Sequence, residues 1–120
     1  VINCAGLLQD APGETVGSVH RDAPRALFQA CEAAGVRRVI QISAIGADRA
    51  GGTDFARTKH EADLDLQRRD LDWVILRPSM IIGDAAYGGS ALLRGLAVLP
   101  VVPVMADMPP LQPVLLDDED

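Results

Sequence analysis

Aromatic, basic and cysteine residues are all scarce in this sequence, and each shortage narrows the class of protein. Only 3% of the 120 residues are aromatic, although 48% are hydrophobic. The core must therefore be aliphatic, which suits buried parallel strands covered by helices. The formal net charge of −6 argues against nucleic acid and anionic membrane surfaces as partners, because both require a basic protein face.

Long apolar runs are also absent. The longest candidate, residues 91–105, is interrupted by Arg94, Pro100 and Pro103, so it falls short of the ~18 apolar residues of a spanning helix. The first residues, VINCAG, lack the basic region of a signal peptide. We therefore predict no integral membrane segment, and the length accommodates one small domain.

The chain has two cysteines and lacks metal-binding motifs such as CxxC and HExxH. Cys4 falls at the end of a predicted strand, and Cys31 falls on a predicted helix. We expect two reduced, buried thiols rather than a disulfide, and from them a cytoplasmic location. No metal site is predicted.

Three apolar runs alternate with two helical patterns. Residues 1–5, 39–43 and 72–77 predict strands, while residues 16–34 and 54–69 have helical spacing. Right-handed crossovers make the three strands parallel neighbours. The predicted fold class is α/β, a partial Rossmann-like doubly wound sheet of three strands with flanking helices. Because the chain starts in a strand without Met, we expect a fragment whose N-terminal βαβ half is missing.

The first helix is expected to bury one face, and its ends carry capping signals. Thr15 is a candidate N-cap, and Gly35 is a candidate C′ residue. Pro24 predicts either a kink or the start of the regular helix. His20 lies on the apolar face, which favours a structural histidine over a catalytic base. The predicted buried face consists of Val16, Val19, His20, Ala23, Leu27, Ala30, Cys31 and Ala34.

The second helix begins after Thr53 or Asp54 and is rich in polar residues, which predict one solvated side. These residues are Arg57, Lys59, His60, Glu61, Asp63 and Asp65. Pro78 ends the third strand, because proline cannot donate a hydrogen bond to a sheet. A loop over residues 79–89 and a short helix over residues 90–98 are expected to follow.

The segments that follow the strands predict a binding site. Residues 3–6, 43–46 and 77–83 are small, glycine-bearing or hydroxylated. Ligands of open α/β sheets bind beyond the carboxyl ends of the strands, where these three segments are expected to converge.

Four short motifs occur in and around these segments in a fixed order. N-x-A-G follows the first strand, I-S-A the second, F-x-x-x-K opens the second helix, and R-P-S follows the third strand. This order resembles the short-chain dehydrogenase/reductase superfamily, and within it the atypical and extended branch of NAD-dependent epimerase-like and NmrA-like proteins. The phrases APRALFQACEAAGVRRVIQISAIGAD and LDWVILRPSMIIG look like relatives of the NAD(P)H-binding accessory subunit of respiratory complex I.

The resemblance implies NAD or NADP as cofactor and a small-molecule substrate whose identity stays open. It implies that residues 1–98 are the C-terminal half of an NAD(P)-binding Rossmann domain, and that residues 99–120 are a Pro-rich and acidic connection toward a missing C-terminal segment. The glycine-rich turn that would hold the pyrophosphate, G-x-x-G-x-x-G, does not occur. The implied cofactor-binding residues are Asn3, Ala5, Gly6, Ser43, Ala44, Lys59, Pro78, Ser79, Met80 and Ile81.

Position 55 departs from the family pattern. The implied catalytic positions are Ser43, Lys59 and Phe55, and the family places a tyrosine acid/base at position 55. Positions 55 and 59 share a helix face, where an ammonium would lower the pKa of a phenol. Phenylalanine has no titratable proton, and loss of a positioned acid/base typically lowers the rate by ~10²–10⁴. Cofactor binding does not need the phenol.

Two functions therefore remain open. One is an NAD(P)-dependent oxidoreductase or epimerase-like enzyme, in which Asp48, Asp54 or Asp84 could replace the tyrosine, although no spacing selects one of them. The other is a dinucleotide-binding structural or redox-sensing module with little or no turnover, which Phe55 favours. The strand at residues 1–5 would have an open, apolar edge, which predicts self-association.

Overall fold

The structure of the chain is a computed structural model, which describes residues 1–48, 52–82, 89–101 and 114–115. The chain divides into two compact units, Val1–Arg77 and Pro78–Asp120. In the described residues, the first unit holds an all-parallel sheet and two long helical regions, and the second holds a short parallel strand pair and one helix.

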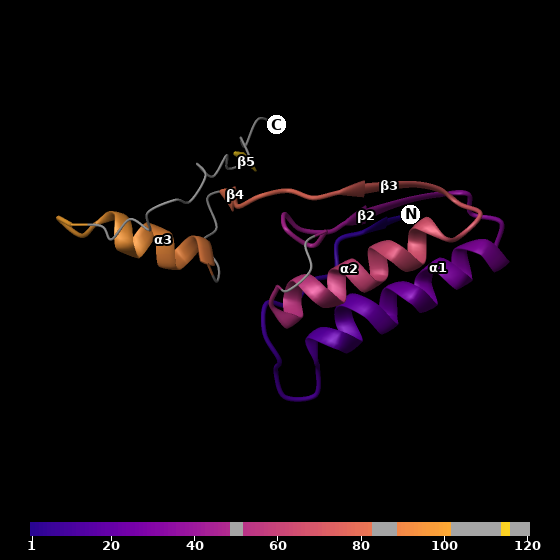
Figure 1. Ribbon diagram of the computed structural model, residues 1–120, viewed down its shortest axis with the longest axis horizontal. Helices are drawn as coiled ribbons and strands as arrows, with labels where there is room; N and C mark the ends of the chain where they lie inside the picture. Colours follow the sequence, from indigo (N-terminus) through magenta and orange to yellow (C-terminus); the bar gives the residue numbers. More distant parts are fainter. Residues whose placement is uncertain (49–51, 83–88, 102–113, 116–120) are drawn as a thin grey trace. The chain divides into compact units, whose positions relative to one another are not determined.

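Three parallel strands form the sheet of the first unit in the order β1-β2-β3 (Figure 1). They are β1 Ile2–Asn3, β2 Arg38–Ile42 and β3 Asp72–Leu76. The predicted α/β class with three parallel strands is confirmed. β1 is shorter than predicted, because the Asn3 side chain accepts a hydrogen bond from the Ala5 amide at 3.2 Å and turns the backbone away from the sheet.

The helical regions of this unit lie between consecutive strands. They are the π-helix η1 Ser18–Asp22, followed directly by α1 Ala23–Ala33, and then α2 Asp54–Gln67. Pro24 lies in the first turn of α1. It therefore marks the start of the regular helix, which is one of the two alternatives that the sequence predicts.

The caps follow the predicted chemistry. Thr15 and Thr53 each accept a hydrogen bond through Oγ1 from the amide three residues later, at 3.1 and 3.3 Å. Gly35 has φ = 70°, and the amide of the next residue donates to the Cys31 carbonyl at 2.9 Å. This bond closes a Schellman motif, which requires a residue in the left-handed conformation at the position of Gly35.

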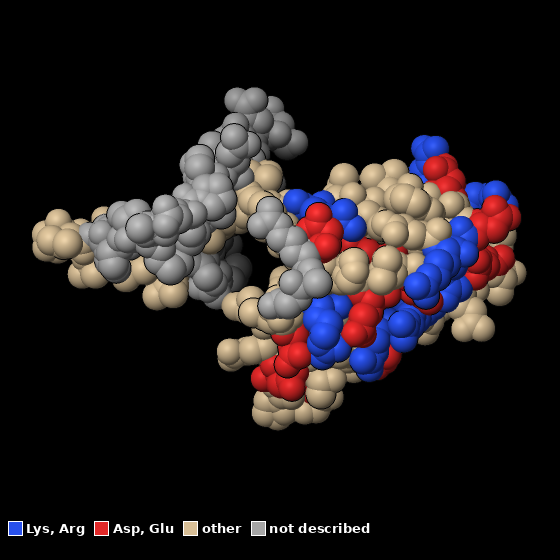
Figure 2. All heavy atoms as spheres, in the orientation of Figure 1, with Lys and Arg blue, Asp and Glu red and all other residues tan. Residues whose placement is uncertain are grey.

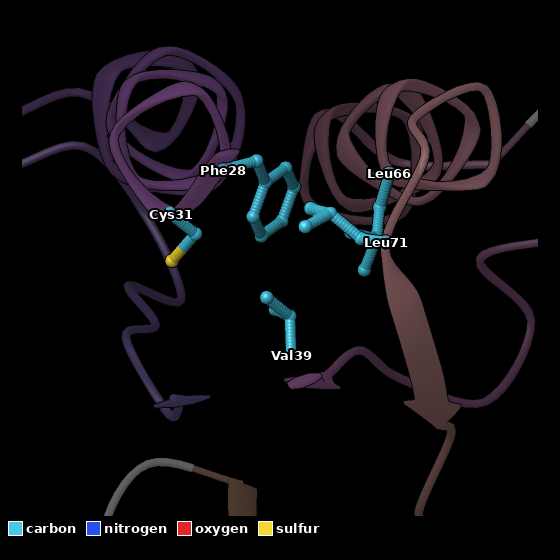
Figure 3. Close-up of a cluster of buried hydrophobic side chains, with 5 residues drawn as sticks. All are labelled: Phe28, Cys31, Val39, Leu66 and Leu71. Carbon is cyan, nitrogen blue, oxygen red and sulfur yellow. The ribbon is translucent and has the colours of Figure 1, made fainter. Parts of the chain in front are cut away.

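Helices α1 and α2 lie on the same face of the sheet, and the hydrophobic core fills the space between them and β2 (Figure 3). Phe28 points from α1 toward Leu66 and Leu71, and Val39 points up from β2 to meet them. The core cluster consists of Phe28, Cys31, Val39, Leu66 and Leu71.

The buried side of the first helical region differs from the predicted face. Pro24 and Phe28 are buried. Ala23, Ala30 and Ala34, which the pattern assigns to the buried face, are exposed. The π-helix η1 accounts for the difference. Its turns are wider than those of an α-helix, so every later residue is rotated about the helix axis relative to a 3.6-residue pattern.

Free thiols occur at both cysteines, as predicted. Cys31 is buried in the core, but Cys4 is exposed. The expectation of two buried thiols is therefore wrong for Cys4, because β1 ends at Asn3 and leaves the next residue outside the sheet.

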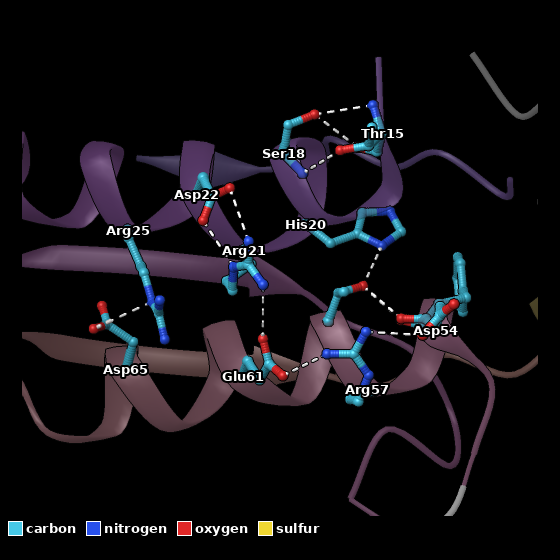
Figure 4. A network of polar contacts seen from close by, with 12 residues as sticks. Thr15, Ser18, His20, Arg21, Asp22, Arg25, Asp54, Arg57, Glu61 and Asp65 are labelled. Atoms are coloured by element: carbon cyan, nitrogen blue, oxygen red, sulfur yellow. Dashed lines mark hydrogen bonds and ion pairs between the residues drawn. The ribbon is translucent and has the colours of Figure 1, made fainter. Parts of the chain in front are cut away.

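Ion pairs link the outer surfaces of the two helical regions. Figure 2 shows basic and acidic side chains interspersed over this side of the first unit. Arg69 pairs with Glu32 at 2.6 Å and with Asp65 at 2.7 Å. Arg21 reaches Glu61 at 3.5 Å, as Figure 4 shows. These pairs are partly exposed, so each contributes at most ~1 kcal/mol.

The opposite face of the sheet is apolar, and no described helix of the first unit covers it. Register pairs Ile2 with Ile40 and Ile40 with Val74, and these side chains alternate away from the buried ones. Ile42 and Leu76 continue the same face. Ile2 is 62% exposed and Leu76 is 48% exposed. Among the described residues no strand pairs with the outer edge of β1, which is the edge from which the sequence predicts self-association.

The second unit contains two strands that the sequence does not predict. Strand β4 (Ile81–Ile82) lies in the expected loop, and β5 (Val114–Leu115) lies in the expected Pro-rich connection. They pair in parallel, and two residues are too few to show a strand period. Helix α3 (Gly89–Ala97) is close to the predicted helix. Across the described ranges, no helix combines the length and apolar character needed to cross a membrane.

Candidate functional site

Lys59 is buried at the carboxyl end of β2. It is 5% exposed, and its Nζ donates to the Ile42 carbonyl at 3.0 Å. The Phe55 ring lies one turn earlier on α2, with its centroid 5.6 Å from Nζ. Burial lowers the pKa of Lys59, and the charge of Asp63 opposes this shift.

Three residues from three segments lie around this ammonium. His20 meets Phe55 edge-on, with ring centroids 5.0 Å apart. A Cβ added to Gly6 would lie 3.9 Å from His20 Nε2 and 4.0 Å from Lys59 Nζ. Gly6, His20, Phe55 and Lys59 therefore form one group beyond the ends of β1 and β2, which we call the Lys59 cluster. Of the predicted site residues, the structure brings Gly6, Phe55 and Lys59 together here.

Both ring nitrogens of His20 lie within hydrogen-bonding distance of a partner. Nε2 lies 2.8 Å from the Leu7 amide, and Nδ1 lies 3.2 Å from Thr58 Oγ1. Burial, reinforced by the positive charge of Lys59, lowers the pKa of His20 to about 4. The prediction of a buried, satisfied histidine agrees with this environment.

Ser43 is engaged elsewhere. Its Oγ donates to Asp63 Oδ2 at 2.8 Å, and the same carboxylate oxygen accepts from Arg77 Nη2 at 3.0 Å. Ser43 and Asp63 are both buried. Among the described residues the hydroxyl therefore bonds to the buried Asp63, which Arg77 also contacts, and makes no bond to the Lys59 cluster.

The solvated side predicted for α2 is wrong for several of its members. Lys59 and Asp63 are buried, and His60 is half-buried rather than on the surface. Asp63 Oδ1 and His60 Nδ1 are enclosed without a hydrogen-bond partner in the described part of the chain. The four-residue spacing between Lys59 and Asp63 was the available signal, because it places both on the face that packs against the sheet.

Asn3 joins two strands rather than facing open space. It is buried, and its Nδ2 donates to Gln41 Oε1 at 2.8 Å across the β1–β2 ladder. Ala5 is exposed and Ala44 is half-buried. These residues border the same strand ends as the Lys59 cluster.

The other candidates are not members of this cluster. Pro78, Ser79 and Met80 are half-buried and Ile81 is exposed, all in the second unit. Asp48 is exposed, and Asp54 pairs with Arg57 at 2.8 Å. Asp84 lies outside the described residues.

A pocket of about 430 Å³ opens beside Phe55. One wall comes from the loop after β1, and the other from the start of α2. Its volume lies within the usual range of small-molecule sites. The lining residues are Leu8, Gln9, Asp10, Val16, Thr53, Asp54 and Phe55.

The family described as NAD(P)H-binding matches residues 2–97 of the chain. The chain belongs to this family. This match and the Rossmann-like architecture agree with the short-chain dehydrogenase/reductase type that the motifs resemble, and the family description supports NAD or NADP as cofactor.

Similar proteins support the assignment. A Bacillus halodurans protein described as an NAD-dependent epimerase/dehydratase has a TM-score of 0.58 at 24% identity, over 72% of this chain and 43% of its own. The oxidoreductase ylbE of Lactococcus lactis has a TM-score of 0.59 at 30% identity, over 72% and 42%. A ceramide reductase of Caulobacter vibrioides is 29% identical over 105 residues, which are 88% of this chain and 33% of the reductase. The chain therefore spans less than half the length of each.

The described residues fit one side of such a cofactor. Lys59 presents an ammonium at the strand ends, and the Ile42 carbonyl takes only one of its three N–H groups. Gly6 brings backbone without a side chain toward the same ammonium. These features suit a hydroxylated ribose, whereas the sequence contains no glycine-rich turn for the pyrophosphate.

Proposed function

We propose that this chain forms the nicotinamide-ribose side of a dinucleotide site, and that residue 55 takes no part in proton transfer. The observation that carries the proposal is the position of Lys59, buried beyond β2 and bonded to the Ile42 carbonyl at 3.0 Å. In this role Lys59 donates its remaining N–H groups to ribose hydroxyls. The dinucleotide, when bound, supplies hydride transfer.

The remaining predicted contacts belong to the same proposal. Asn3, Ala5 and Gly6 border the adenine-side ribose. Ser43 orients a substrate carbonyl or alcohol and, with Ala44, contacts the cofactor. Pro78, Ser79, Met80 and Ile81 face the carboxamide. The proposal also includes the division between residues 1–98 and residues 99–120, and a cytoplasmic location, which the two free thiols support.

Because residue 55 is phenylalanine, the best-supported function is dinucleotide binding with little or no turnover. The ring packs against His20 and Lys59 and has no proton to exchange. A reductase is the second candidate, because one relative is a ceramide reductase. In that case another group, such as Asp54 at the pocket beside Phe55, delivers the proton.

Titration with NADPH and NADH tests the binding step, in this chain and in any longer natural protein that contains it. Binding of either dinucleotide without carbonyl reduction is the expected result. Phe55→Tyr should then gain turnover, because the new phenol would lie one turn from Lys59. Phe55→Leu is the matched control, since it changes the ring without adding a phenol.

The outcomes separate the two candidates. Reduction by the unsubstituted protein that persists in Phe55→Leu favours the reductase with another proton donor. If neither NADPH nor NADH binds, the site is not a dinucleotide site and both candidates fail.

A further inference from the structure

We propose that His20 is a positioning residue, which holds the Gly6–Leu7 turn against α2 and thereby sets the affinity for the dinucleotide. The inference rests on the proposed function, because the turn borders the proposed ribose site. His20 itself makes no contact with the cofactor in this proposal.

The hydrogen bonds around His20 permit a single protonation state. The Leu7 amide can only donate, so Nε2, at 2.8 Å, must be an unprotonated acceptor. In a neutral imidazole the proton then lies on Nδ1, which donates to Thr58 Oγ1 at 3.2 Å. The Thr58 hydroxyl completes the relay by donating to the Asp54 carbonyl at 2.8 Å. Figure 4 shows His20 reaching from the first helical region toward α2.

This relay connects three segments of the first unit. The turn after β1 is bonded to His20, His20 lies in η1, and Thr58 belongs to α2, next to Lys59. A displaced Leu7 would carry Gly6 with it. The gap between Gly6 and the Lys59 ammonium would then change, and with it the space for the dinucleotide between these two proposed contacts.

The local backbone supports a placement role. His20 lies at the centre of the five-residue π-helix Ser18–Asp22 and is 1% exposed. Helical turns of this kind are uncommon and occur frequently at functional sites. An apolar side chain of similar size would fill the volume but would leave the Leu7 amide without an acceptor.

Three variants separate placement from general stability. His20→Leu removes the acceptor, whereas His20→Gln keeps one, because the Gln Oε1 can occupy the place of Nε2. Cys31→Ala is the matched control, since it opens a cavity in the core away from the turn. Thr58→Val keeps the histidine but removes the hydroxyl that fixes its tautomer.

Two readouts apply to each variant. Amide hydrogen exchange of Leu7 reports the turn without any cofactor, and titration with NADPH reports affinity. His20→Leu should speed Leu7 exchange and weaken NADPH binding at least tenfold. His20→Gln should restore most of the Leu7 protection and most of the NADPH affinity. Thr58→Val should give exchange rates and affinities between those of His20→Leu and His20→Gln. Cys31→Ala should lower the melting temperature while leaving the dissociation constant within about twofold.

The pH profile provides a further readout. Protonated His20 would direct an N–H at the Leu7 amide, so NADPH affinity of the unsubstituted protein should decline as the pH approaches about 4, the pKa of His20 in the folded chain. The decline should be smaller in His20→Gln. The charged side chain that acts on His20 is Lys59, whose positive charge lowers the pKa of His20 further.

Several results would overturn the inference. Unchanged Leu7 exchange in His20→Leu would show that the histidine does not hold the turn. Failure of His20→Gln to restore affinity, or an equal loss in Cys31→Ala, would reduce its role to packing. If the unsubstituted protein binds neither dinucleotide, the proposed function and the affinity claim both fail, and Leu7 exchange still decides whether His20 holds the turn.

Discussion

His20 is buried in its neutral form, so its protonation is linked to unfolding. Its pKa is about 4 in the folded chain and ~6.5 when unfolded. The unfolded chain therefore binds more protons between these values, and the free energy of unfolding should decrease as pH falls from 6.5 toward 4. Above 6.5 this contribution is fully present.

Urea denaturation at pH 7 and pH 4.5 measures the effect. His20→Gln provides the control, because it keeps the acceptor and removes the titration. The decrease should be smaller in the control, and equal decreases in both proteins would assign the effect to carboxylates instead.

Asp63 is expected to be the most sensitive charged residue of α2. Asp63→Asn would leave Arg77, whose side chain is 31% exposed, without its charge partner, and would weaken the bond to Ser43. Breaking a buried pair typically costs 3–5 kcal/mol, and the partial exposure of Arg77 reduces this to about 2–3 kcal/mol.

Asp65→Asn is the matched control on the same helix. Asp65 pairs with Arg69 and Arg25 at a partly exposed position, so its loss should cost less than ~1 kcal/mol. Equal losses in the two variants, measured by urea denaturation, would contradict a buried role for Asp63.

Part of the candidate site follows from residue spacing, and part does not. The helical turn between Phe55 and Lys59 is local, so their proximity is predictable. The partner of Ser43 is not local. Its hydroxyl rotates toward Asp63, which Arg77 holds from the end of another strand. Such a choice depends on tertiary packing, and so does the burial of Asp63 and Lys59.

At the scale of single elements, substitution of Gly35 tests how much the C-terminal cap of α1 contributes to stability. Its φ of 70° lies in the left-handed region, so Gly35→Ala should cost about 1 kcal/mol. Gly35→Asn should cost less, because asparagine tolerates this conformation better than alanine. Thermal denaturation of both variants checks the order, and an equal cost would show that the Schellman motif tolerates any residue.

The elements of the first unit were more predictable than the faces they bury. Capping by Thr15, Thr53 and Gly35 is local chemistry, and strand positions follow from apolar runs. The prediction of the buried face of α1 was wrong because η1 interrupts the helical period. A π-helix has no characteristic residue type by which the sequence could predict it. Strand β4 escaped prediction because its partner, β5, lies more than 30 residues later.

On the scale of the whole molecule, the open face of the sheet predicts association. Ile2→Lys adds a charge beside the free edge of β1, where charged side chains oppose edge pairing. We expect the unsubstituted chain to be poorly soluble or to self-associate, and this variant to contain more monomer by sedimentation velocity.

Leu8→Lys is the matched control for Ile2→Lys. Both parent residues are 62% exposed, but Leu8 lies in a loop away from the sheet. Equal effects would show that net charge, rather than the sheet, governs association. A sharp, cooperative transition of a monomeric unsubstituted chain would contradict the prediction.

Both strand pairings of the first unit also have a kinetic consequence. Asn3 and Gln41 are 38 residues apart, and Arg38 and Asp72 are 34 apart, so no hairpin can act as a local nucleus. The entropic cost of closing each long loop arises before the strand pairing contributes any stabilising contacts. We therefore expect strand pairing to follow the packing of α1 and α2 during refolding. Until then, the unpaired apolar strands can associate with neighbouring chains. The yield of refolded protein should accordingly fall with protein concentration more steeply than final stability suggests.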